Sequence, residues 1–289
     1  MSDNYVILND KLIKQTIARI SINDSGFLYG FGCYDTLLAL NYKLLFVEEH
    51  IKRLNDSLRE LRISRMGFDP IELTEKVSNL LIINKHRNAR IRITVTKEDI
   101  DLTNIHIENP KMNQLITSSK LAEDYYNRDV KPFKLCISKY IRNHPESIPP
   151  SLKLTSLANH LFASMDAKEK GFDDGIMLTH EGYLTEGTSF NIFFVKNNKL
   201  FTPHLKTGIL PGITRSVLLN LFKEKNIIFE EGFYKRESLY EADEAFVTSS
   251  VRGIVPIIQV DQCVKTTGDS TKMIVEYYYQ YLKELSCNE

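Results

Sequence analysis

Residues 182–194 read Gly182-Tyr-Leu-Thr-Glu186-Gly-Thr-Ser-Phe190-Asn-Ile-Phe-Phe194, and this stretch decides the fold of the second half of the chain. Apart from Asn191, the run from Phe190 to Val195 is apolar and aromatic, which is typical of a buried strand. Glu186 lies just before that run and is followed by a Gly-Thr-Ser turn. We therefore expect an acid on a loop at the edge of a buried strand, although a solvated hairpin turn gives the same pattern.

Strands and helices alternate on both sides of this stretch. Residues 157–170 have a helical pattern that Gly171 ends, because glycine readily adopts the left-handed conformation of a helix C-cap. The second half therefore predicts an α/β domain with a mixed sheet. Its further expected strands are 134–138, 175–179 and 243–248, and its further expected helices are 214–225 and 271–285.

The first half predicts an α+β arrangement. Short apolar runs flank Asn9-Asp10 and Asn41-Tyr42, and both patterns are typical of β-hairpins. The polar stretch 119–128 separates the halves, so the expected domains are 1–119 and 131–289, with a linker at 120–130. The expected strands of the first half are 5–8, 11–13, 33–40, 43–47, 89–96 and 115–118, and its expected helices are 48–61 and 71–83.

Composition and charge exclude several classes of function. The 289 residues include 37 Lys and Arg against 37 Asp and Glu, and the resulting net charge of zero lacks the basic surface that nucleic-acid binding needs. No run approaches the roughly 20 apolar residues of a membrane span, and the polar, acidic N-terminus is unlike a signal peptide. We expect a cytoplasmic protein without nucleic-acid or membrane partners. Four scattered cysteines predict neither a metal site nor disulfides; they are Cys33, Cys136, Cys263 and Cys287.

Two further segments could bind an anion. Residues 209–215, Ile-Leu-Pro-Gly-Ile-Thr-Arg, precede a helical pattern, and the first amides of a helix attract negative charge. Gly212 allows close backbone approach there, and Thr214 adds a hydroxyl. Thr248-Ser249-Ser250 follows an expected strand and offers further hydroxyls and amides. Taken alone, the Pro-Gly pair is better explained as a helix-entry turn, and neither segment is specific.

Lys153 is a candidate nucleophile. It lies between two leucines and follows Pro149-Pro150, which stiffen the chain. A lysine between leucines is less easily solvated than a surface lysine, and a partly neutral amine is what a Schiff-base nucleophile needs. Most such lysines only extend their amine to solvent. The weight of Lys153 therefore depends on the motifs around it.

Six blocks in a fixed order give the chain a resemblance to one family, the class IV pyridoxal-phosphate enzymes. The similarity covers nearly the whole chain, and six ordered blocks are far more specific than any single motif. The blocks are Asp24-Ser-Gly26-Phe-Leu-Tyr-Gly30-Phe-Gly32-Cys-Tyr34-Asp35-Thr36, His50-x-x-Arg53-Leu54, Lys153, Glu186-Gly-Thr-Ser-x-Asn191, Leu210-Pro-Gly-Ile-Thr-Arg215 and Phe246-Val-Thr-Ser-Ser250.

The resemblance implies the D-amino-acid aminotransferase-like fold, called fold type IV. In it a small N-terminal α+β domain and a larger C-terminal α/β domain hold pyridoxal 5'-phosphate in the cleft between them. Lys153 resembles the catalytic lysine that forms a Schiff base with the cofactor, and Glu186 resembles the acid on the ring nitrogen. A homodimer is also implied, whose partner contributes loop residues near His106. The other candidates for cofactor binding are Arg53, Ser189, Asn191, Leu210, Gly212, Ile213, Thr214, Ser249 and Ser250, and those for substrate binding are Tyr34, Arg92, Lys97 and Val251.

Three activities of this family compete. Branched-chain aminotransferases usually carry a tyrosine five positions after the lysine, where this chain has Ala158. The better-known D-amino-acid enzymes carry an Arg-x-His pair in the loop that here runs from Lys97 to His106, and this pair is missing. The 4-amino-4-deoxychorismate lyases resemble the chain loosely at Arg142-Asn-His-Pro-Glu-Ser-Ile-Pro and at Ser249-Ser-Val-Arg-Gly-Ile-Val-Pro.

We expect an aminotransferase that moves an amino group between a small amino acid and a 2-oxo acid, with the D-series slightly ahead. The lyase, which forms 4-aminobenzoate and pyruvate, is the alternative, and the branched-chain L-amino-acid activity is less expected. A cofactor-binding protein without turnover is disfavoured, because Lys153 and Glu186 are both present.

Overall fold

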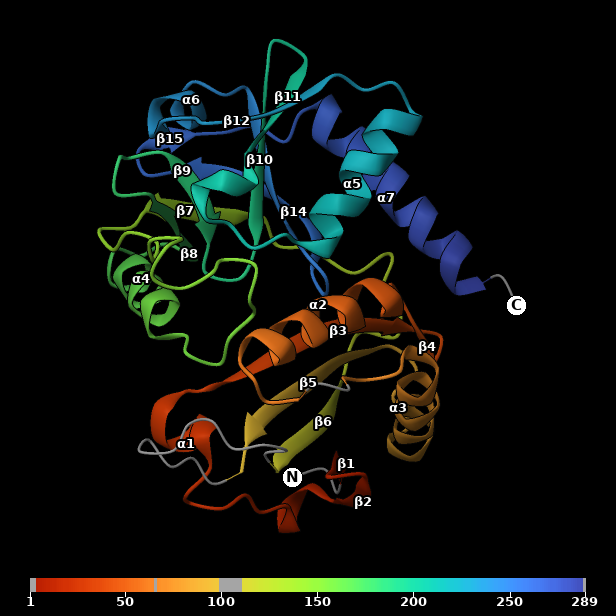
Figure 1. The fold of residues 1–289 in the computed structure, drawn as a ribbon. Helices are drawn as coiled ribbons and strands as arrows, with labels where there is room; N and C mark the ends of the chain where they lie inside the picture. The colour runs from red at the N-terminus through yellow and green to blue at the C-terminus, as the bar shows by residue number, and fades with distance from the viewer. Residues whose placement is uncertain (1–3, 65–66, 99–110, 288–289) are drawn as a thin grey trace. The chain divides into compact units, whose positions relative to one another are not determined.

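A computed structural model describes residues 4–64, 67–98 and 111–287 (Figure 1). By its internal contacts the chain forms two compact units, each with its own sheet. Unit 1 comprises residues 1–128, 152–157 and 286–289, and unit 2 comprises residues 129–151 and 158–285. The short segment that carries Lys153 thus belongs to unit 1, although its neighbours in the sequence belong to unit 2. The domain limits 1–119 and 131–289 stay a prediction.

Unit 1 is built on a six-stranded antiparallel sheet of order β2-β1-β6-β5-β3-β4. Both turn pairs named above close hairpins: Asn9-Asp10 and Asn41-Tyr42 all have positive φ, which matches the twist of the flanking strands. The strands are β1 (Tyr5–Leu8), β2 (Lys11–Lys14), β3 (Gly32–Leu40), β4 (Lys43–Leu44), β5 (Ala89–Lys97) and β6 (Met112–Lys120). The expected strand 43–47 was too long: Phe46 adopts a left-handed conformation with φ 56°, and a helix begins directly after it.

Two long helices, α2 (Val47–Glu60) and α3 (Pro70–Asn84), bury their apolar residues in a core shared with one face of this sheet. Ile51, Leu54 and Leu58 of α2 lie in that core, as the helical spacing predicted. A short helix, α1 (Ser25–Tyr29), begins at the N-cap Asp24, whose carboxylate accepts hydrogen bonds from the amides of the first turn. A 3₁₀ turn spans Gln15–Ile17.

Unit 2 contains a mixed sheet of order β12-β11-β10-β13-β14-β7-β8-β9, with β15 beside β14. Parallel pairs join β11 to β12, β14 to β7 and β7 to β8, and the other neighbours are antiparallel. The strands are β7 (Phe133–Ile137), β8 (Asp174–Leu178), β9 (Leu184–Gly187), β10 (Asn191–Lys196), β11 (Lys199–Pro203), β12 (Phe229–Gly232), β13 (Glu244–Ser249), β14 (Gly253–Val260) and β15 (Cys263–Val264). The helices are α4 (Ala158–Glu169), α5 (Ile213–Glu224), α6 (Arg236–Tyr240) and α7 (Asp269–Cys287), and a 3₁₀ turn spans Leu205–Thr207.

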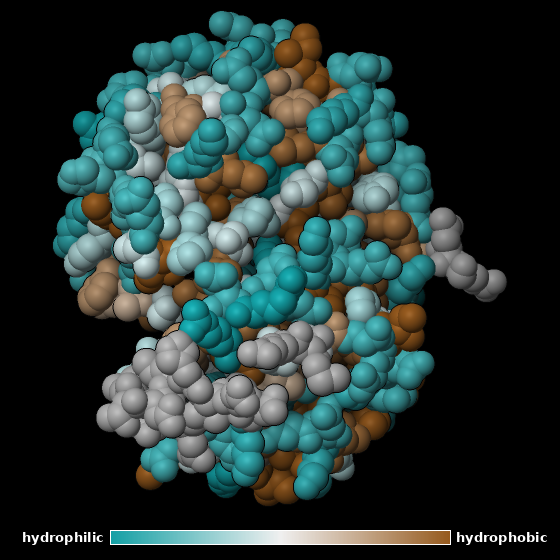
Figure 2. All heavy atoms as spheres, viewed as in Figure 1, coloured by the Kyte–Doolittle hydropathy of each residue, from teal (hydrophilic) through white to brown (hydrophobic). Residues whose placement is uncertain are grey.

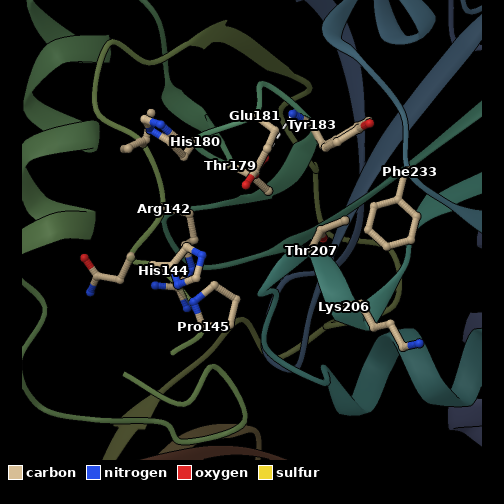
Figure 3. A pocket seen from close by; sticks show the side chains of 12 residues that line it. Arg142, His144, Pro145, Thr179, His180, Glu181, Tyr183, Lys206, Thr207 and Phe233 are labelled. Atoms are coloured by element: carbon tan, nitrogen blue, oxygen red, sulfur yellow. Dashed lines mark hydrogen bonds between the residues drawn. The ribbon is translucent and has the colours of Figure 1, made fainter. Parts of the chain in front are cut away.

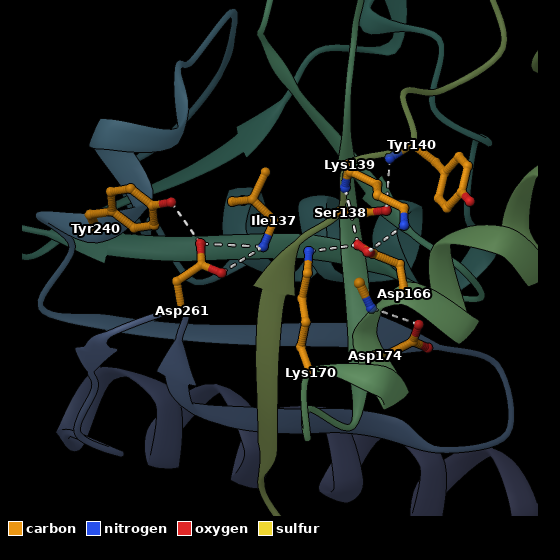
Figure 4. A network of polar contacts seen from close by, with 10 residues as sticks. Ile137, Ser138, Lys139, Tyr140, Asp166, Lys170, Asp174, Tyr240 and Asp261 are labelled. Atoms are coloured by element: carbon orange, nitrogen blue, oxygen red, sulfur yellow. Dashed lines mark hydrogen bonds and ion pairs between the residues drawn. The ribbon is translucent and has the colours of Figure 1, made fainter.

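Carboxylates fasten loops and helices to the centre of this sheet (Figure 4). Asp261 accepts a hydrogen bond from the hydroxyl of Tyr240 at 2.6 Å and also from the amide of Ile137 in β7. Asp166 of α4 accepts from the amide of Lys139 and pairs with Lys170 at 2.8 Å. For Asp166, which is 3% exposed, these contacts satisfy a charge that burial would otherwise make costly.

Polar and charged side chains cover most of the face drawn in Figure 2, with apolar side chains between them. Some helices also expose apolar residues: Leu161, Phe162 and Met165 of α4 are between 50% and 60% exposed. Within the described residues, no helix combines the length and the apolar character that crossing a membrane requires.

Candidate active site

The segment 152–157 adds to the edge of β3 like a short extra strand. The amide of Tyr34 donates to the carbonyl of Lys153, and the amide of Thr155 donates to the carbonyl of Gly32, both at 2.9 Å. Leu154 packs against the apolar core of unit 1. Because successive side chains of an extended segment point to opposite faces, Lys153 lies on the face away from that core.

Lys153, Tyr34 and Arg92 gather on this second face of the sheet. The Nζ atom of Lys153 lies 4.9 Å from the centre of the Tyr34 ring, and the guanidinium carbon of Arg92 lies 3.7 Å from it. The strand register explains the second contact, because Tyr34 pairs with Thr94 and Arg92 is two residues away on β5. Burial lowers the pKa of Arg92, although a guanidinium remains protonated at neutral pH. Two cations on one aromatic ring form a surface that suits a carboxylate.

Arg53 lies on α2 and is held by a buried carboxylate. Asp35 of β3 accepts from Nε of Arg53 at 2.9 Å and from its Nη2 at 2.8 Å. It also accepts from Nδ1 of His50 at 2.8 Å and from the amide of Thr36 at 2.6 Å. Burial acts to raise the pKa of Asp35, but the charges and hydrogen bonds of Arg53 and His50 outweigh it and hold that pKa well below its usual range. Asp35 is therefore ionised at neutral pH.

Other substrate candidates of unit 1 are placed less favourably. Lys97 is the last residue of β5 and is only 4% exposed, so the structure does not present it on the surface near Arg92. Its amide donates to the hydroxyl of Ser25, which ties it to α1. His106 lies outside the described residues. Among the residues that the structure describes, no three His, Cys, Asp or Glu side chains are grouped as metal ligands.

Glu186 does not lie on a loop, as the sequence suggested, but inside the buried strand β9, where it is 5% exposed. The pairing of β9 with β8 carries the strand pattern up to Gly187, and the turn follows only at 188–190. Its Oε2 accepts from Nδ2 of Asn191 at 3.1 Å and from the amide of Leu210 at 3.0 Å. Its Oε1 pairs with Nη2 of Arg142 at 3.1 Å. The carboxylate thus has a cation, an amide side chain and a backbone amide around it.

Asn191 links Glu186 to the segment before α5. Its Nδ2 also donates to the carbonyl of Leu210 at 3.0 Å, so one side chain holds both the acid and the Leu210 backbone. Gly212 follows closely, and a Cβ at this position would overlap Oδ1 of Asn191. Only glycine therefore fits here without displacing Asn191.

The N-terminus of α5 and the end of β13 supply donors for an anion. Gly212 is the N-cap of α5 and provides no side-chain cap, so the first amides of the helix, those of Ile213 and Thr214, have no acceptor from a capping side chain. Asn191 pairs in register with Thr248, which brings the end of β13 to the same region of unit 2. The Oγ1 atom of Thr248 is buried and has no hydrogen-bond partner among the described residues.

The remaining candidates follow β13 or the turn after β9. Ser249 ends β13, Ser250 and Val251 come next, and all three are partly exposed. The hydroxyl of Ser189 accepts from Nη1 of Arg252 at 3.3 Å. Unit 2 therefore brings Glu186, Asn191, Leu210, Gly212 and Thr214 together by direct contacts or adjacency in the chain.

A pocket of about 360 Å³ lies within unit 2, next to the cation that pairs with Glu186. Arg142 lines it, with His144 and Pro145 on one side and Phe233 on the other (Figure 3). The volume lies in the range of small-molecule sites. The lining residues are Ile141, Arg142, Asn143, His144, Pro145, Thr179, His180, Glu181, Tyr183, Lys206, Thr207 and Phe233.

The sequence alone assigns no role to Arg142, Asp35 or His50. All three stand in the motifs quoted above, but those motifs do not show that each residue pairs with another residue of the site. The available signal was charge: a carboxylate or guanidinium expected to be buried needs a partner of opposite sign. The pairing itself joins residues 44 positions apart in one case and 18 in the other, which spacing alone does not reveal.

Comparison with known proteins gives a consistent result. The model of the family described as amino-transferase class IV matches residues 32–260. A putative branched-chain-amino-acid aminotransferase of Methanocaldococcus jannaschii is 32% identical over 94% of each chain. An aminodeoxychorismate lyase of Bacillus subtilis is 30% identical over 97% of this chain and 95% of its own. A D-alanine aminotransferase of Bacillus licheniformis is 27% identical over 89% and 88%.

The fold is shared with a solved structure. The branched-chain aminotransferase of Thermoproteus uzoniensis, crystallised with norvaline, matches with a TM-score of 0.88 and 28% identity over 96% of this chain and 94% of its own. The expected fold class, an α+β part followed by an α/β part as in the class IV aminotransferases, is confirmed by these similarities.

Proposed function

Since the chain belongs to the class IV aminotransferase family, we propose that it is an aminotransferase that uses pyridoxal 5'-phosphate to move an amino group between a small amino acid and a 2-oxo acid. Pyridoxal phosphate is the cofactor of this family. The observation that carries the proposal is Glu186, a buried carboxylate held by Arg142, Asn191 and the amide of Leu210. Such an acid is what a protonated pyridine nitrogen requires.

The residues of unit 2 fit this cofactor. Its phosphate needs several N–H and O–H donors, and the uncapped N-terminus of α5 together with the unpartnered hydroxyl of Thr248 provides them. Ser249 and Ser250 add hydroxyls at the end of β13. Leu210 offers an apolar side chain for a ring face, while its amide holds Glu186. When bound, the cofactor supplies an electron sink for the charge left at the substrate carbon.

Unit 1 would supply the reacting amine and the substrate contacts. Lys153 would bind the cofactor carbonyl and afterwards remove and return protons at the substrate carbon. Arg53 would bring a planar fork to the phosphate, which suits a dianion better than a single point charge does. Arg92 and Tyr34, which share the face of Lys153, would bind the substrate carboxylate.

The D-series remains the substrate class that the sequence favours, because Ala158 stands where branched-chain enzymes usually carry tyrosine. The lyase activity is the second candidate, supported by the 30% identity to the Bacillus subtilis enzyme over nearly the whole chain. Both activities begin with the same proton removal by lysine. They differ in what leaves: a 2-oxo acid in transamination, or pyruvate with an aromatic amine in the lyase reaction.

We also expect a homodimer. Exposed apolar side chains suit contact with another protein surface. Three such side chains, Phe27, Leu28 and Tyr29, lie on α1 and are between 46% and 74% exposed. Asp24 caps the first turn of α1, so this helix has a defined start. Light scattering at several protein concentrations tests the dimer, and a constant monomer mass would contradict it.

The decisive experiment compares the wild type with Lys153→Ala. Both proteins are incubated with pyridoxal phosphate, reduced with borohydride and digested, and the peptides are analysed by mass spectrometry. We expect the cofactor on Lys153 in the wild type, and no attachment and no amino transfer in the variant. Lys52→Ala, an exposed lysine on α2, is the matched control and should behave as wild type. An active Lys153→Ala protein that carries the cofactor on another lysine would overturn the proposal.

Substrates are then offered separately to the wild type. D-alanine, L-leucine and 4-amino-4-deoxychorismate distinguish the candidate activities. Conversion of an amino acid to its 2-oxo acid supports transamination, and the reacting enantiomer identifies the series. Release of pyruvate from the chorismate derivative alone would replace the proposal with the lyase activity.

A further inference from the structure

The cluster of Asp35, His50 and Arg53 is more elaborate than stability requires. Asp35 is fully buried, and the neighbouring core-facing residues of β3, Cys33 and Leu37, are fully buried as well. A buried ion pair is seldom more stable than an apolar replacement, because desolvation cancels much of the attraction. Core stability alone is therefore a weak explanation for this pair.

The contacts of Asp35 fix the orientation of the Arg53 guanidinium. Nε and Nη2 of Arg53 each donate to a different oxygen of Asp35, so the two bonds together set the plane of the guanidinium. His50 lies one helical turn before Arg53 and donates to the same oxygen that accepts from Nη2. This second donor stops the carboxylate from rotating and swapping partners.

The cluster supplies orientation rather than charge. Burial is the largest influence on His50 and lowers its pKa, although Asp35 acts to raise it, so His50 is neutral at neutral pH. The charges of Asp35 and Arg53 then cancel. An unsupported arginine would offer a phosphate more net charge but would lose more side-chain entropy on binding.

We propose that Asp35 and His50 are positioning residues that hold the Arg53 guanidinium in a fixed orientation for the cofactor phosphate. The inference rests on the proposed function, because Arg53 must first bind that phosphate. If only net charge mattered, removing the negative charge of Asp35 would strengthen phosphate binding. The positioning role predicts that it weakens phosphate binding instead.

The test compares the dissociation constants of pyridoxal phosphate and of pyridoxal, which lacks the phosphate. The variants are Asp35→Asn, His50→Gln and Arg53→Lys. We expect each variant to lower the preference for the phosphorylated form by about tenfold or more, with little change in the dissociation constant of pyridoxal. A tenfold change corresponds to the loss of about one charge-assisted hydrogen bond. Asp56→Asn is the matched control, because Asp56 pairs with Arg59 on the exposed side of the same helix.

The outcomes distinguish a failure of the positioning role from a failure of the proposed function. If Arg53→Lys loses the preference but Asp35→Asn and His50→Gln keep it, the positioning role is overturned while the proposed function stands. If Arg53→Lys keeps the preference, the phosphate role of Arg53 fails and the inference fails with it. Circular dichroism checks the fold of each variant. Should Asp35→Asn not fold, His50→Gln decides the question, and Asp35→Glu should restore part of the preference.

Discussion

Asp35 in unit 1 and Glu186 in unit 2 are both buried carboxylates that meet an arginine, but they are supported in different ways. Asp35 is held mainly by side chains of α2, and its contacts to Arg53 and His50 cross from a strand to a helix. Glu186 is held by a side chain five residues away and by the backbone amide of Leu210, besides Arg142. Asp35 positions an arginine, whereas Glu186 is itself positioned by one.

This difference indicates which carboxylate keeps its position when a neighbouring side chain is replaced. Backbone amides keep their place when one side chain is replaced, so the environment of Glu186 has a support that single substitutions leave intact. Asp35 also accepts from one backbone amide, that of Thr36. Its contacts to α2, however, depend on the side chains of Arg53 and His50, and replacing either one alters them. Glu186 is therefore suited to contact a ligand directly, whereas Asp35 is suited to act through another residue.

Among the substitutions that test this comparison, the largest effect is expected for Glu186→Gln. A neutral amide cannot hold a proton on a ring nitrogen as a carboxylate does, so kcat should fall by about 100-fold or more while the variant still folds. Steady-state kinetics measure the loss. Glu169→Gln, at an exposed glutamate near the end of α4, is the control and should retain wild-type rates. Equal activity of Glu186→Gln and wild type would remove Glu186 from the site.

A smaller effect is expected for Gly212→Ala, which tests the support of Glu186. The added Cβ would overlap Oδ1 of Asn191 and push that side chain away from Glu186. We expect about 1–3 kcal/mol lower stability and weaker binding of pyridoxal phosphate, measured by urea unfolding and by titration. Gly171→Ala is the control: its φ of 81° makes alanine strained, but no atom lies within 4 Å of the new Cβ. It should lose stability without losing cofactor affinity.

His50, which donates a hydrogen bond to Asp35, should affect the pH dependence of the free energy of unfolding. The pKa of His50 is lowered in the folded protein, mainly by burial, so below the usual value near 6.5 the unfolded chain takes up a proton that the folded chain does not. Stability should therefore fall as the pH drops from 7 to 5. His50→Gln should flatten this slope, by at most about 1.4 kcal/mol per pH unit. His86, whose pKa burial also lowers, contributes in the same direction, and His86→Gln gives the comparison. An unchanged slope in His50→Gln would show that His50 is charged in the folded protein.

The smallest effect concerns the thiol beside Asp35. Burial, together with the charge of Asp35, raises the pKa of Cys33 to about 12, and burial raises that of Cys136 to about 11. Iodoacetamide at pH 8 should modify the exposed Cys287 first and leave Cys33 and Cys136 untouched. Peptide mass mapping over time measures the order. Alkylation of Cys33 at the rate of Cys287 would mean that the cluster around Asp35 is open to solvent.

Much of the fold was readable from local patterns. The hairpin turns at Asn9 and Asn41, the helices α2, α3 and α5, and the buried strand β10 follow from spacing and turn residues, because these depend on neighbours in the sequence. Boundaries were less accurate where conformation changed abruptly. The strand ending at Leu44 was extended too far because nothing in the residue types indicates the left-handed conformation of Phe46.

The sequence by itself determined which residue types are available: six ordered motifs, the lysine, the acid and the uncapped helix start. Only the tertiary structure decided their partners. It placed Lys153 on the edge of β3, Arg142 against Glu186, and His50 against Asp35, and it put Glu186 within a strand and Lys97 in the interior. The physical reason is that local patterns reflect backbone preferences and hydrophobic periodicity. The pairing of buried charges, by contrast, is set by distances between elements that folding alone brings together.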